Sequence, residues 1–171
     1  MQIQCDTREK KSEIQRIEQQ FDALGIQHFR SKLYVGDYMN LDNPRLVIDR
    51  KKDLQELCGN VTQQHERFKK ELLRAEEQGI RIIILCEHGE DIHELEDVYF
   101  WDNPRRKLYK WVTINGKPRR VKENPRKLAI SGQQLFKCLS TIKERYGVLF
   151  YFCDKSETGK RIAELLRIGN G

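Results

Sequence analysis

Three polar residues lie where the sequence predicts neighbouring strands of a sheet. Asp37 follows Gly36 at the start of one predicted strand, and Asp49 and Lys51 end the next one. Because side chains alternate along a strand, Asp49 and Lys51 share one face and Arg50 points to the other. If the two strands pair as a hairpin, Asp37 and Asp49 can share one divalent cation. Two carboxylates and several waters suit Mg²⁺, which gives up its waters reluctantly.

The lysine indicates which reaction such an ion would serve. An ammonium group two residues from a metal ligand can orient a metal-bound water, or offset the negative charge of a phosphate in its transition state. The pattern therefore favours metal-dependent hydrolysis of a phosphodiester. An acid-x-Lys spacing also occurs in ordinary surface salt bridges, so a purely structural cluster is the alternative interpretation of Asp37, Asp49 and Lys51.

The elements that must position these residues follow from the spacing of apolar residues and from Gly, Pro and capping signals. The predicted order begins with a strand, a helix and a three-strand meander, followed by a short helix, a second helix and a buried strand. An insertion comes next, and then a helix, a strand and a final helix. Their ranges are 1–6, 12–24, 26–33, 38–41, 46–51, 53–58, 61–78, 80–86, 131–146 and 148–153, with the last helix after residue 154. This order predicts a single α/β domain over residues 1–171, with three layers and a central mixed β-sheet flanked by helices.

The positive charge of the chain is concentrated in one segment. The 171 residues carry 32 Lys+Arg and 26 Asp+Glu, a formal net charge of +6. Ten of the bases and one acid lie between Pro104 and Lys127, so this segment carries +9 and the rest of the chain −3. Aromatic residues are interleaved with these bases or precede them: Tyr99, Phe100, Trp101, Tyr109 and Trp111. Within the same segment, Asn115-Gly116 predicts a tight hairpin.

We describe residues 97–128 as a basic, aromatic-containing insertion. Lys and Arg neutralise phosphates and planar rings stack on bases, so its composition fits a nucleic-acid contact surface. A solvated excursion anchored to the domain by its aromatic residues is the alternative. The residues expected to contact DNA are Arg105, Arg106, Lys107, Lys110, Trp111, Lys117, Arg119, Arg120 and Lys122.

Composition excludes several classes of protein. The apolar runs are far shorter than the roughly 18 residues that span a bilayer, and we expect no membrane association. The first residues lack the basic start and apolar core of a signal peptide. Five Cys without a CxxC pair favour reduced thiols over a disulfide framework. These features predict a cytoplasmic protein.

Three motifs in order resemble those of XPF-type nuclease domains, the family of XPF, its Mus-type relatives and the archaeal Hef protein. Asp6-Thr7-Arg8-Glu9 is similar to D-x-R-E, Gly36-Asp37-Tyr38 to G-D-[YF], and Val47-Ile48-Asp49-Arg50-Lys51 to V-x-E-R-K. The resemblance continues through Arg67-Phe68 and residues 82–87, and it resumes from Ile130 to Leu166, so it covers most of the chain except the insertion.

The resemblance implies a restriction-endonuclease-like fold and an endonuclease that cuts branched, flap or fork DNA near junctions of duplex and single strand. It implies Mg²⁺ or Mn²⁺ as cofactor, Asp37 and Asp49 as metal ligands and Lys51 as the catalytic lysine. Arg50 would organise the active site or bind phosphate. Asp6, Arg8 and Glu9 would line the same cleft, with a structural ion pair as the alternative for Arg8 and Glu9.

Several departures from the family pattern bear on this expectation. Asp49 stands where the family has Glu, and Gln55 stands where it has an acid, so Asp53 or Glu56 would have to substitute. The sequence leaves no room for a helix-hairpin-helix module or a helicase region, and we expect a free-standing nuclease domain. A catalytically inactive DNA-binding module that pairs with an active partner is the main alternative, and a sequence-specific restriction-type enzyme is another.

The resemblance also implies dimerisation, as a homodimer or with a protein partner. The final helix offers one candidate contact, through Ile162, Leu165 and Leu166. Such an apolar stripe is more often plain core, and that is the favoured interpretation.

Overall fold

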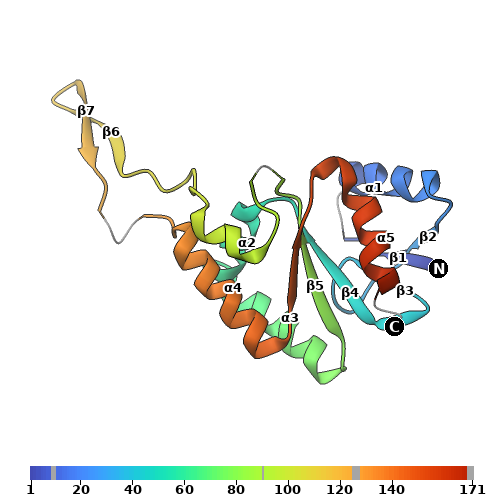
Figure 1. Ribbon diagram of the computed structural model, residues 1–171. Helices are drawn as coiled ribbons and strands as arrows, with labels where there is room; N and C mark the ends of the chain where they lie inside the picture. Colours follow the sequence, from blue (N-terminus) through green and yellow to red (C-terminus); the bar gives the residue numbers. More distant parts are fainter. Residues whose placement is uncertain (9–10, 90, 125–127, 169–171) are drawn as a thin grey trace.

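A six-stranded mixed sheet forms the centre of the molecule (Figure 1). The computed structural model describes residues 1–8, 11–89, 91–124 and 128–168. The strand order is β2-β1-β3-β4-β5-β8; β1 pairs with β2, β4 with β5 and β5 with β8 in parallel, and β3 runs antiparallel to both of its neighbours. The strands are β1 (Gln2–Cys5), β2 (Gln27–Arg30), β3 (Tyr38–Asn40), β4 (Asn43–Lys51), β5 (Arg81–Cys86) and β8 (Leu149–Phe152).

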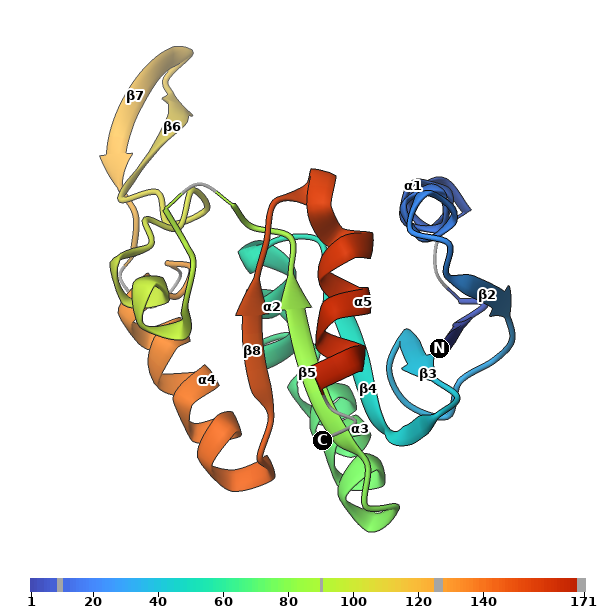
Figure 2. The same cartoon turned by 45° about the vertical axis from the view of Figure 1, so that its right-hand side comes forward.

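Helices cover both faces of this sheet, as Figure 2 shows. On one face lie α1 (Lys11–Ala23) and α5 (Thr158–Ile168), packed on Ile48, Ile83 and Leu85. On the other lie α2 (Leu54–Val61), α3 (His65–Glu77) and α4 (Gly132–Tyr146), with the short 3₁₀ helix η1 (Leu95–Phe100) beside α4. A second 3₁₀ turn, η3 (Lys155–Glu157), precedes α5. The predicted α/β fold with a mixed sheet between helical layers is confirmed.

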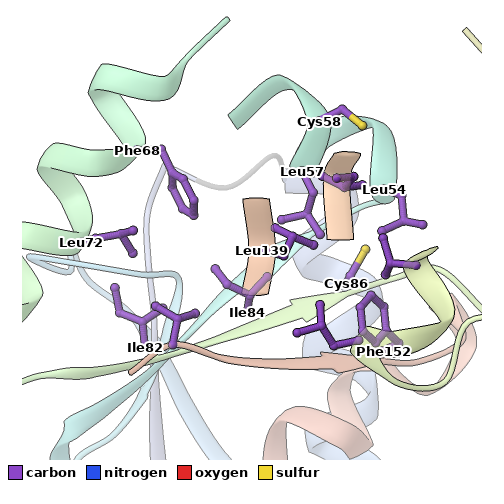
Figure 3. Packing of buried hydrophobic residues seen from close by; sticks show 14 of the residues in the cluster. Leu54, Leu57, Cys58, Phe68, Leu72, Ile82, Ile84, Cys86, Leu139 and Phe152 are labelled. Atoms are coloured by element: carbon purple, nitrogen blue, oxygen red, sulfur yellow. The ribbon is translucent and has the colours of Figure 1, made fainter. Parts of the chain in front are cut away.

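The core on the α2, α3 and α4 face is built on strands β4, β5 and β8. Figure 3 shows Phe68 and Leu72 of α3 and Leu57 of α2 directed towards Ile82 and Ile84 of β5. Leu57, Ile84 and Leu139 have no exposed surface. This packing fixes α2 and α3 against the strands that end in the polar residues singled out above.

The predicted three-strand meander is wrong in one respect. β2 does not pair with β3; it pairs in parallel with β1, which lies between them. The chain therefore makes a strand, helix, strand crossover through α1, and only β3 and β4 form a hairpin. The apolar alternation of residues 26–33 predicts a strand but does not encode which neighbour it pairs with.

Two boundaries also differ from the expectation. Pro44 was expected to separate two strands, but β4 already begins at Asn43, beyond a register shift between Met39 and Asn40. Pro44 is tolerated because it lies in the irregular stretch between the pairs Asn40–Asn43 and Met39–Val47, and proline is accepted at such irregularities of a strand. The predicted break at Gly59 is absent too, since α2 continues to Val61.

Local signals set α4 as predicted. Ser131 accepts a hydrogen bond from the backbone N–H of Gln134, whose side chain accepts from the backbone N–H of Ser131, forming a capping box. Gly147 ends the helix in the left-handed conformation, at φ 64°. α4 thus begins beside the insertion and runs away from it (Figure 1).

The insertion contains a separate two-stranded sheet. β6 (Tyr109–Ile114) and β7 (Lys117–Lys122) pair antiparallel, and their connection has positive φ at Asn115 (51°) and Gly116 (72°). Both turn residues at positive φ make the type I′ turn that an Asn-Gly pair favours. The hairpin predicted from these two residues is confirmed, and it projects from the body of the molecule (Figure 1). We call residues 109–122 the basic hairpin.

The final helix is part of the core. Ile162 and Leu166 have no exposed surface and Leu165 has 4%. They pack with strands β3 and β4 of the main sheet, as the core interpretation predicted, and are not a surface for a second copy of the chain. In the part of the chain that is described, no helix has the length and apolar character to cross a bilayer.

Candidate active site

The β3–β4 hairpin brings Asp37 beside Asp49. Tyr38 pairs with Ile48, and the backbone N–H of Asp37 donates to the carbonyl of Ile48 at 2.8 Å. Gly36 has φ 71°, and a Cβ there would lie 3.1 Å from both the Ile48 carbonyl oxygen and Val47 Cγ2. Glycine is therefore required by the backbone conformation and by the close approach of β4. The glycine before Asp37 sets where that carboxylate lies.

Asp49 and Lys51 form a buried ion pair on the α3 face of β4. Lys51 Nζ donates to Asp49 Oδ1 at 2.7 Å. Asp49 is 5% exposed and Lys51 is 7% exposed. Lys51 Nζ also lies 5.8 Å from the centroid of the Phe68 ring. Burial alone would lower the pKa of Lys51, but the negative charges of Asp49 and Asp37 outweigh burial and raise it above its ordinary value. Lys51 is therefore a permanent cation in the physiological range.

Arg50 acts on both faces of the sheet. Its backbone N–H donates to Asp37 Oδ2 at 2.8 Å, on the same side as Asp49. Its guanidinium lies on the other side, under α1 and α5, where Nη1 donates to Glu87 Oε2 at 3.1 Å. Arg16 and Thr158 Oγ1 donate to the second carboxylate oxygen of Glu87. The side chain of Glu87 has no exposed surface. The predicted alternation of Arg50 against Asp49 and Lys51 thus holds, and the side chain of Arg50 is engaged in a buried ion pair.

Asp6 and Arg8 extend the site from the end of β1. The backbone N–H of Asp6 donates to the carbonyl of Asp37 at 2.8 Å. The Asp6 carboxylate, 1% exposed, accepts from the backbone N–H of Leu33 at 2.9 Å and from Arg8 Nε. Arg8 is half exposed and also donates to the Leu33 carbonyl. Both residues are held by local contacts, which supports the structural ion pair for Arg8. Glu9, the remaining residue of this motif, lies outside the described residues.

These side chains line one pocket of about 230 Å³, which we call the aspartate pocket. It brings together six residues expected at the site, one of the two acids considered as a substitute, and three residues that were not assigned to the site. The six expected lining residues are Asp6, Arg8, Asp37, Asp49, Arg50 and Lys51, the acid is Glu56, and the three additional ones are Arg67, Glu71 and Arg74.

The α3 residues are the ones that sequence reasoning missed as site residues. Arg67, Glu71 and Arg74 lie one helical turn apart, so they form a stripe next to the buried Phe68. Glu71 Oε1 is 3.4 Å from the backbone N–H of Gly36, which joins α3 to the turn before Asp37. Helical spacing predicts that the three residues share one side of α3, but which neighbour that side faces depends on the packing of Phe68 against the sheet.

Of the two acids that flank Gln55, only Glu56 lines the aspartate pocket. Asp53 is the N-cap of α2, its Oδ1 accepting the backbone N–H of Glu56 at 2.8 Å. Asp53 does not line the aspartate pocket, whereas Glu56 does. Gln55 faces elsewhere and donates to Asn103 Oδ1 at 2.6 Å.

The pocket fits a hard divalent cation. Asp49 Oδ2 is buried and has no hydrogen-bond partner among the described residues, so one carboxylate oxygen is left to bind a cation or water. Asp37 adds a second carboxylate on the same face. Among those same residues no group of three or more Asp, Glu, His or Cys side chains is placed to hold a metal. Two carboxylates completed by waters are sufficient for Mg²⁺, which is bound in many enzymes by one or two.

The residues expected to contact DNA lie apart from this pocket, mostly on the basic hairpin. Cross-strand pairing puts Tyr109, Trp111, Arg120 and Lys122 on one face of it, with the Arg120 guanidinium 4.5 Å from the centroid of the Tyr109 ring. Trp111 is 71% exposed.

Three residues of the insertion also have contacts within the protein. Arg106 Nη1 donates to the Ala129 carbonyl at 2.7 Å, and Lys110 forms an ion pair with Glu123 at 3.0 Å. Trp101 is partly buried against the core, as the anchoring interpretation expected. Arg105 lies at the root of the insertion and Lys117 and Arg119 on β7. The part of the predicted insertion that spans residues 125–127 lies outside the described residues.

Comparison with known proteins identifies a family and a fold for the chain. The family model of the ERCC4 domain matches residues 5–165. Two solved structures are similar, XPF from Aeropyrum pernix and XPF from Aeropyrum pernix in complex with DNA, each with a TM-score of 0.60 and 18% identity. The matches cover 97% and 98% of this chain, which spans 65% and 64% of those chains. At this identity the likeness establishes the fold. The curated proteins give no match.

Proposed function

The chain belongs to the ERCC4 domain family, the XPF-type nuclease domains, and on that premise we propose that it is a metal-dependent, structure-selective DNA endonuclease. It would hydrolyse phosphodiester bonds near junctions of duplex and single strand. The observation that carries the proposal is the aspartate pocket, where Asp37, Asp49 and Lys51 converge and a buried oxygen of Asp49 has no partner among the described residues.

Each residue of the pocket has a task in this proposal. Mg²⁺ or Mn²⁺ bound by Asp37 and Asp49 would supply positive charge against the negative charge that develops on the phosphate. Lys51 donates to Asp49 Oδ1 and keeps further N–H groups, with which its ammonium can orient the attacking water and hold a phosphate oxygen. The Arg50 backbone N–H keeps the carboxylate of Asp37 in its orientation.

The basic hairpin supplies the affinity for DNA in this proposal. Its exposed Lys and Arg side chains would neutralise phosphates, a contribution that depends on salt and not on base sequence. The exposed ring of Trp111 offers a stacking platform for an unpaired base. In its complex, the similar Aeropyrum pernix XPF binds DNA, which supports a DNA ligand for this fold.

Cleavage of labelled flap, fork and linear duplex DNA, in Mg²⁺, Mn²⁺ or EDTA, tests the function. We expect flap or fork cleavage in either metal, none in EDTA and little on the linear duplex. Asp49→Asn should lose at least about 100-fold in rate, a loss typical of removing one electrostatic group at the reacting centre. Asp22→Asn makes the same change at an exposed position of α1 and should cleave like the wild type.

Two outcomes would overturn the proposal. If no substrate is cut in either metal while the protein binds DNA, the inactive DNA-binding module is the correct interpretation. If the linear duplex is cut as fast as the flap and the fork, the structure selectivity is wrong.

A further inference from the structure

A polar groove of about 550 Å³ runs along α2, next to the aspartate pocket. Its walls are rich in side-chain amides and carry three acidic and three basic residues. We call it the amide groove, and the amides that define it are Gln55, Asn60, Gln63 and Gln64. Nothing in the proposed catalytic arrangement uses these residues.

The amide groove connects the aspartate pocket with the root of the insertion. At one end it shares Arg50 and Glu56 with the aspartate pocket. At the other it shares Gln55, Gln63 and Arg105 with a further pocket of about 370 Å³, which reaches Ile130 before α4. The three hollows therefore adjoin one another between the aspartate pocket and the root of the insertion.

A buried asparagine fixes the far end of these hollows. Asn103 is 3% exposed; its Oδ1 accepts from Gln55 Nε2 at 2.6 Å and from the backbone N–H of Arg105 at 3.0 Å. Its Nδ2 donates to the Ile130 carbonyl at 2.8 Å. Asn103 thus ties α2 to both connections of the insertion, at Arg105 on one side and at Ile130 on the other. The end of the groove next to the hairpin is a built feature of the fold.

Asn60 is the observation that indicates a ligand. It lines the groove and is only 8% exposed, and its Nδ2 is 3.3 Å from Gln64 Oε1. Its Oδ1 is buried without a hydrogen-bond partner among the described residues. An unpaired buried carbonyl oxygen is costly unless a donor from a ligand or a water reaches it.

We propose that the amide groove holds the unpaired DNA strand of a junction on its way from the basic hairpin to the aspartate pocket. This inference rests on the proposed function and names the part of the substrate that lies along α2. Amide side chains offer both donors and acceptors, which the exposed edges of unpaired bases can meet. Base pairing occupies those edges in a duplex, so a duplex gains little from this groove.

The size and charge of the groove favour a single strand over a duplex. A hollow of about 550 Å³ lies within the range of roughly 300–1,000 Å³ that is typical of small-ligand sites, and it can take separate nucleotides but not a double helix. Its acidic and basic residues balance, so it does not provide the strong positive field of a duplex-binding surface. The positive charge lies instead on the basic hairpin and at Arg105.

The test uses binding in EDTA, which is independent of cleavage. Fluorescence anisotropy would measure the affinity of the full chain for a fork with unpaired arms and for a linear duplex of the same sequence. The double variant Gln63→Glu/Gln64→Glu places two negative charges on the groove at exposed positions. The matched control Gln15→Glu/Gln19→Glu makes the same change at two exposed positions of α1 outside the groove.

We expect the groove variant to bind the fork about tenfold more weakly, which corresponds to about 1.4 kcal/mol. Its duplex affinity should stay within the change that the control shows. Melting followed by circular dichroism checks that both variants fold.

Equal fork affinity for the groove variant and the control overturns the inference, and so does an equal loss on fork and duplex. If the wild type cuts forks but the groove variant binds and cuts them normally, only the inference about the groove is wrong. If the folded wild type binds no DNA, the proposed function falls together with it.

Discussion

Asp37 and Arg50 are joined by a hydrogen bond of 2.8 Å, in which the backbone N–H of Arg50 donates to the Asp37 carboxylate. The same arginine binds Glu87 through its guanidinium on the opposite face of the sheet. The orientation of a proposed metal ligand is therefore connected, through one strand residue, to a buried ion pair under α1 and α5. Glu87 is a positioning residue in this arrangement, because it acts through Arg50.

Glu87→Gln should lower the free energy of unfolding by about 3 kcal/mol, since it removes the buried negative charge that compensates the guanidinium groups of Arg50 and Arg16. Urea denaturation measures this change. Cleavage should fall as well, with weaker Mn²⁺ binding, because Arg50 is then held less firmly and its backbone N–H orients Asp37 less well. Glu66→Gln changes the same group on the surface of α3, where the side chain is 79% exposed, and should change neither property. Unaltered Mn²⁺ affinity in a destabilised Glu87→Gln variant would show that Glu87 is structural only.

Gly36→Ala should destabilise the protein and weaken Mn²⁺ binding. The new Cβ would lie 3.1 Å from the Ile48 carbonyl and Val47, at a positive φ that alanine adopts at a cost of about 1–2 kcal/mol. Thermal denaturation and metal titration measure the two effects. Gly59→Ala is the matched control, because a Cβ there meets nothing within 4 Å inside α2 and should stabilise the helix by about 1 kcal/mol. A Gly36→Ala variant as stable as the wild type would contradict the close approach of β4.

The charge of Lys51 should persist well above neutral pH. Its pKa is raised in the folded state by Asp49 and Asp37, despite burial. Its stabilising contribution is therefore fully present below the unfolded value of about 10.4 and is lost as the pH rises through the folded pKa. The difference in unfolding free energy between wild type and Lys51→Met should stay constant from about pH 7 to 9 and shrink at higher pH. A difference that declines below pH 9 would show that Lys51 is not held as a cation by these carboxylates.

Removing two cations from the basic hairpin should lower the salt dependence of DNA binding. For Arg119→Ala/Arg120→Ala we expect the slope of log affinity against log salt to decrease by about 2, with weaker binding to every DNA structure. Lys143→Ala/Arg145→Ala removes the same charge from exposed positions of α4 at the end away from the hairpin. That control should keep the wild-type slope. Identical slopes for the two variants would contradict the hairpin as the DNA contact.

A single thiol should react rapidly in the native protein. All five cysteines are free, but burial raises the pKa of Cys5 to about 12 and of Cys58 and Cys153 to about 11, and Cys86 is raised as well. Cys138 is the exposed one. In a titration with an aromatic disulfide reagent at neutral pH, one equivalent of thiol per chain should therefore react quickly. Cys138→Ser should abolish this fast phase. Denaturant should make the remaining thiols react as well. Rapid reaction of a second thiol would contradict the burial of the other four cysteines.

The parts of the fold that the sequence predicted are those with local signals. α4 was predictable because Ser131, Gln134 and Gly147 set its ends within the helix itself, and the basic hairpin because Asn115-Gly116 sets its turn. The pairing of β2 with β1 was not, because no local feature of residues 27–30 distinguishes a parallel from an antiparallel neighbour.

The candidate site divides in the same way. Asp49 and Lys51 could be placed on one face from strand alternation alone, and Asp37 beside them once its strand was taken to pair with theirs as a hairpin. The choice between Asp53 and Glu56 could not be made, because it depends on which carboxylate is consumed by the N-cap of α2. Arg67 and its stripe on α3 reach the pocket only through the packing of Phe68 on the sheet, a tertiary contact that helical spacing does not reveal.

The separateness of the two sheets has a consequence for how this protein can change over evolutionary time. In the described chain β6 and β7 hydrogen-bond only with each other as strands, and the six-stranded sheet is complete without them. Length, charge and ring content of the hairpin can therefore drift while the carboxylates that would hold the ion stay fixed. Substrate preference is free to diversify on this scaffold under selection that leaves the chemistry untouched.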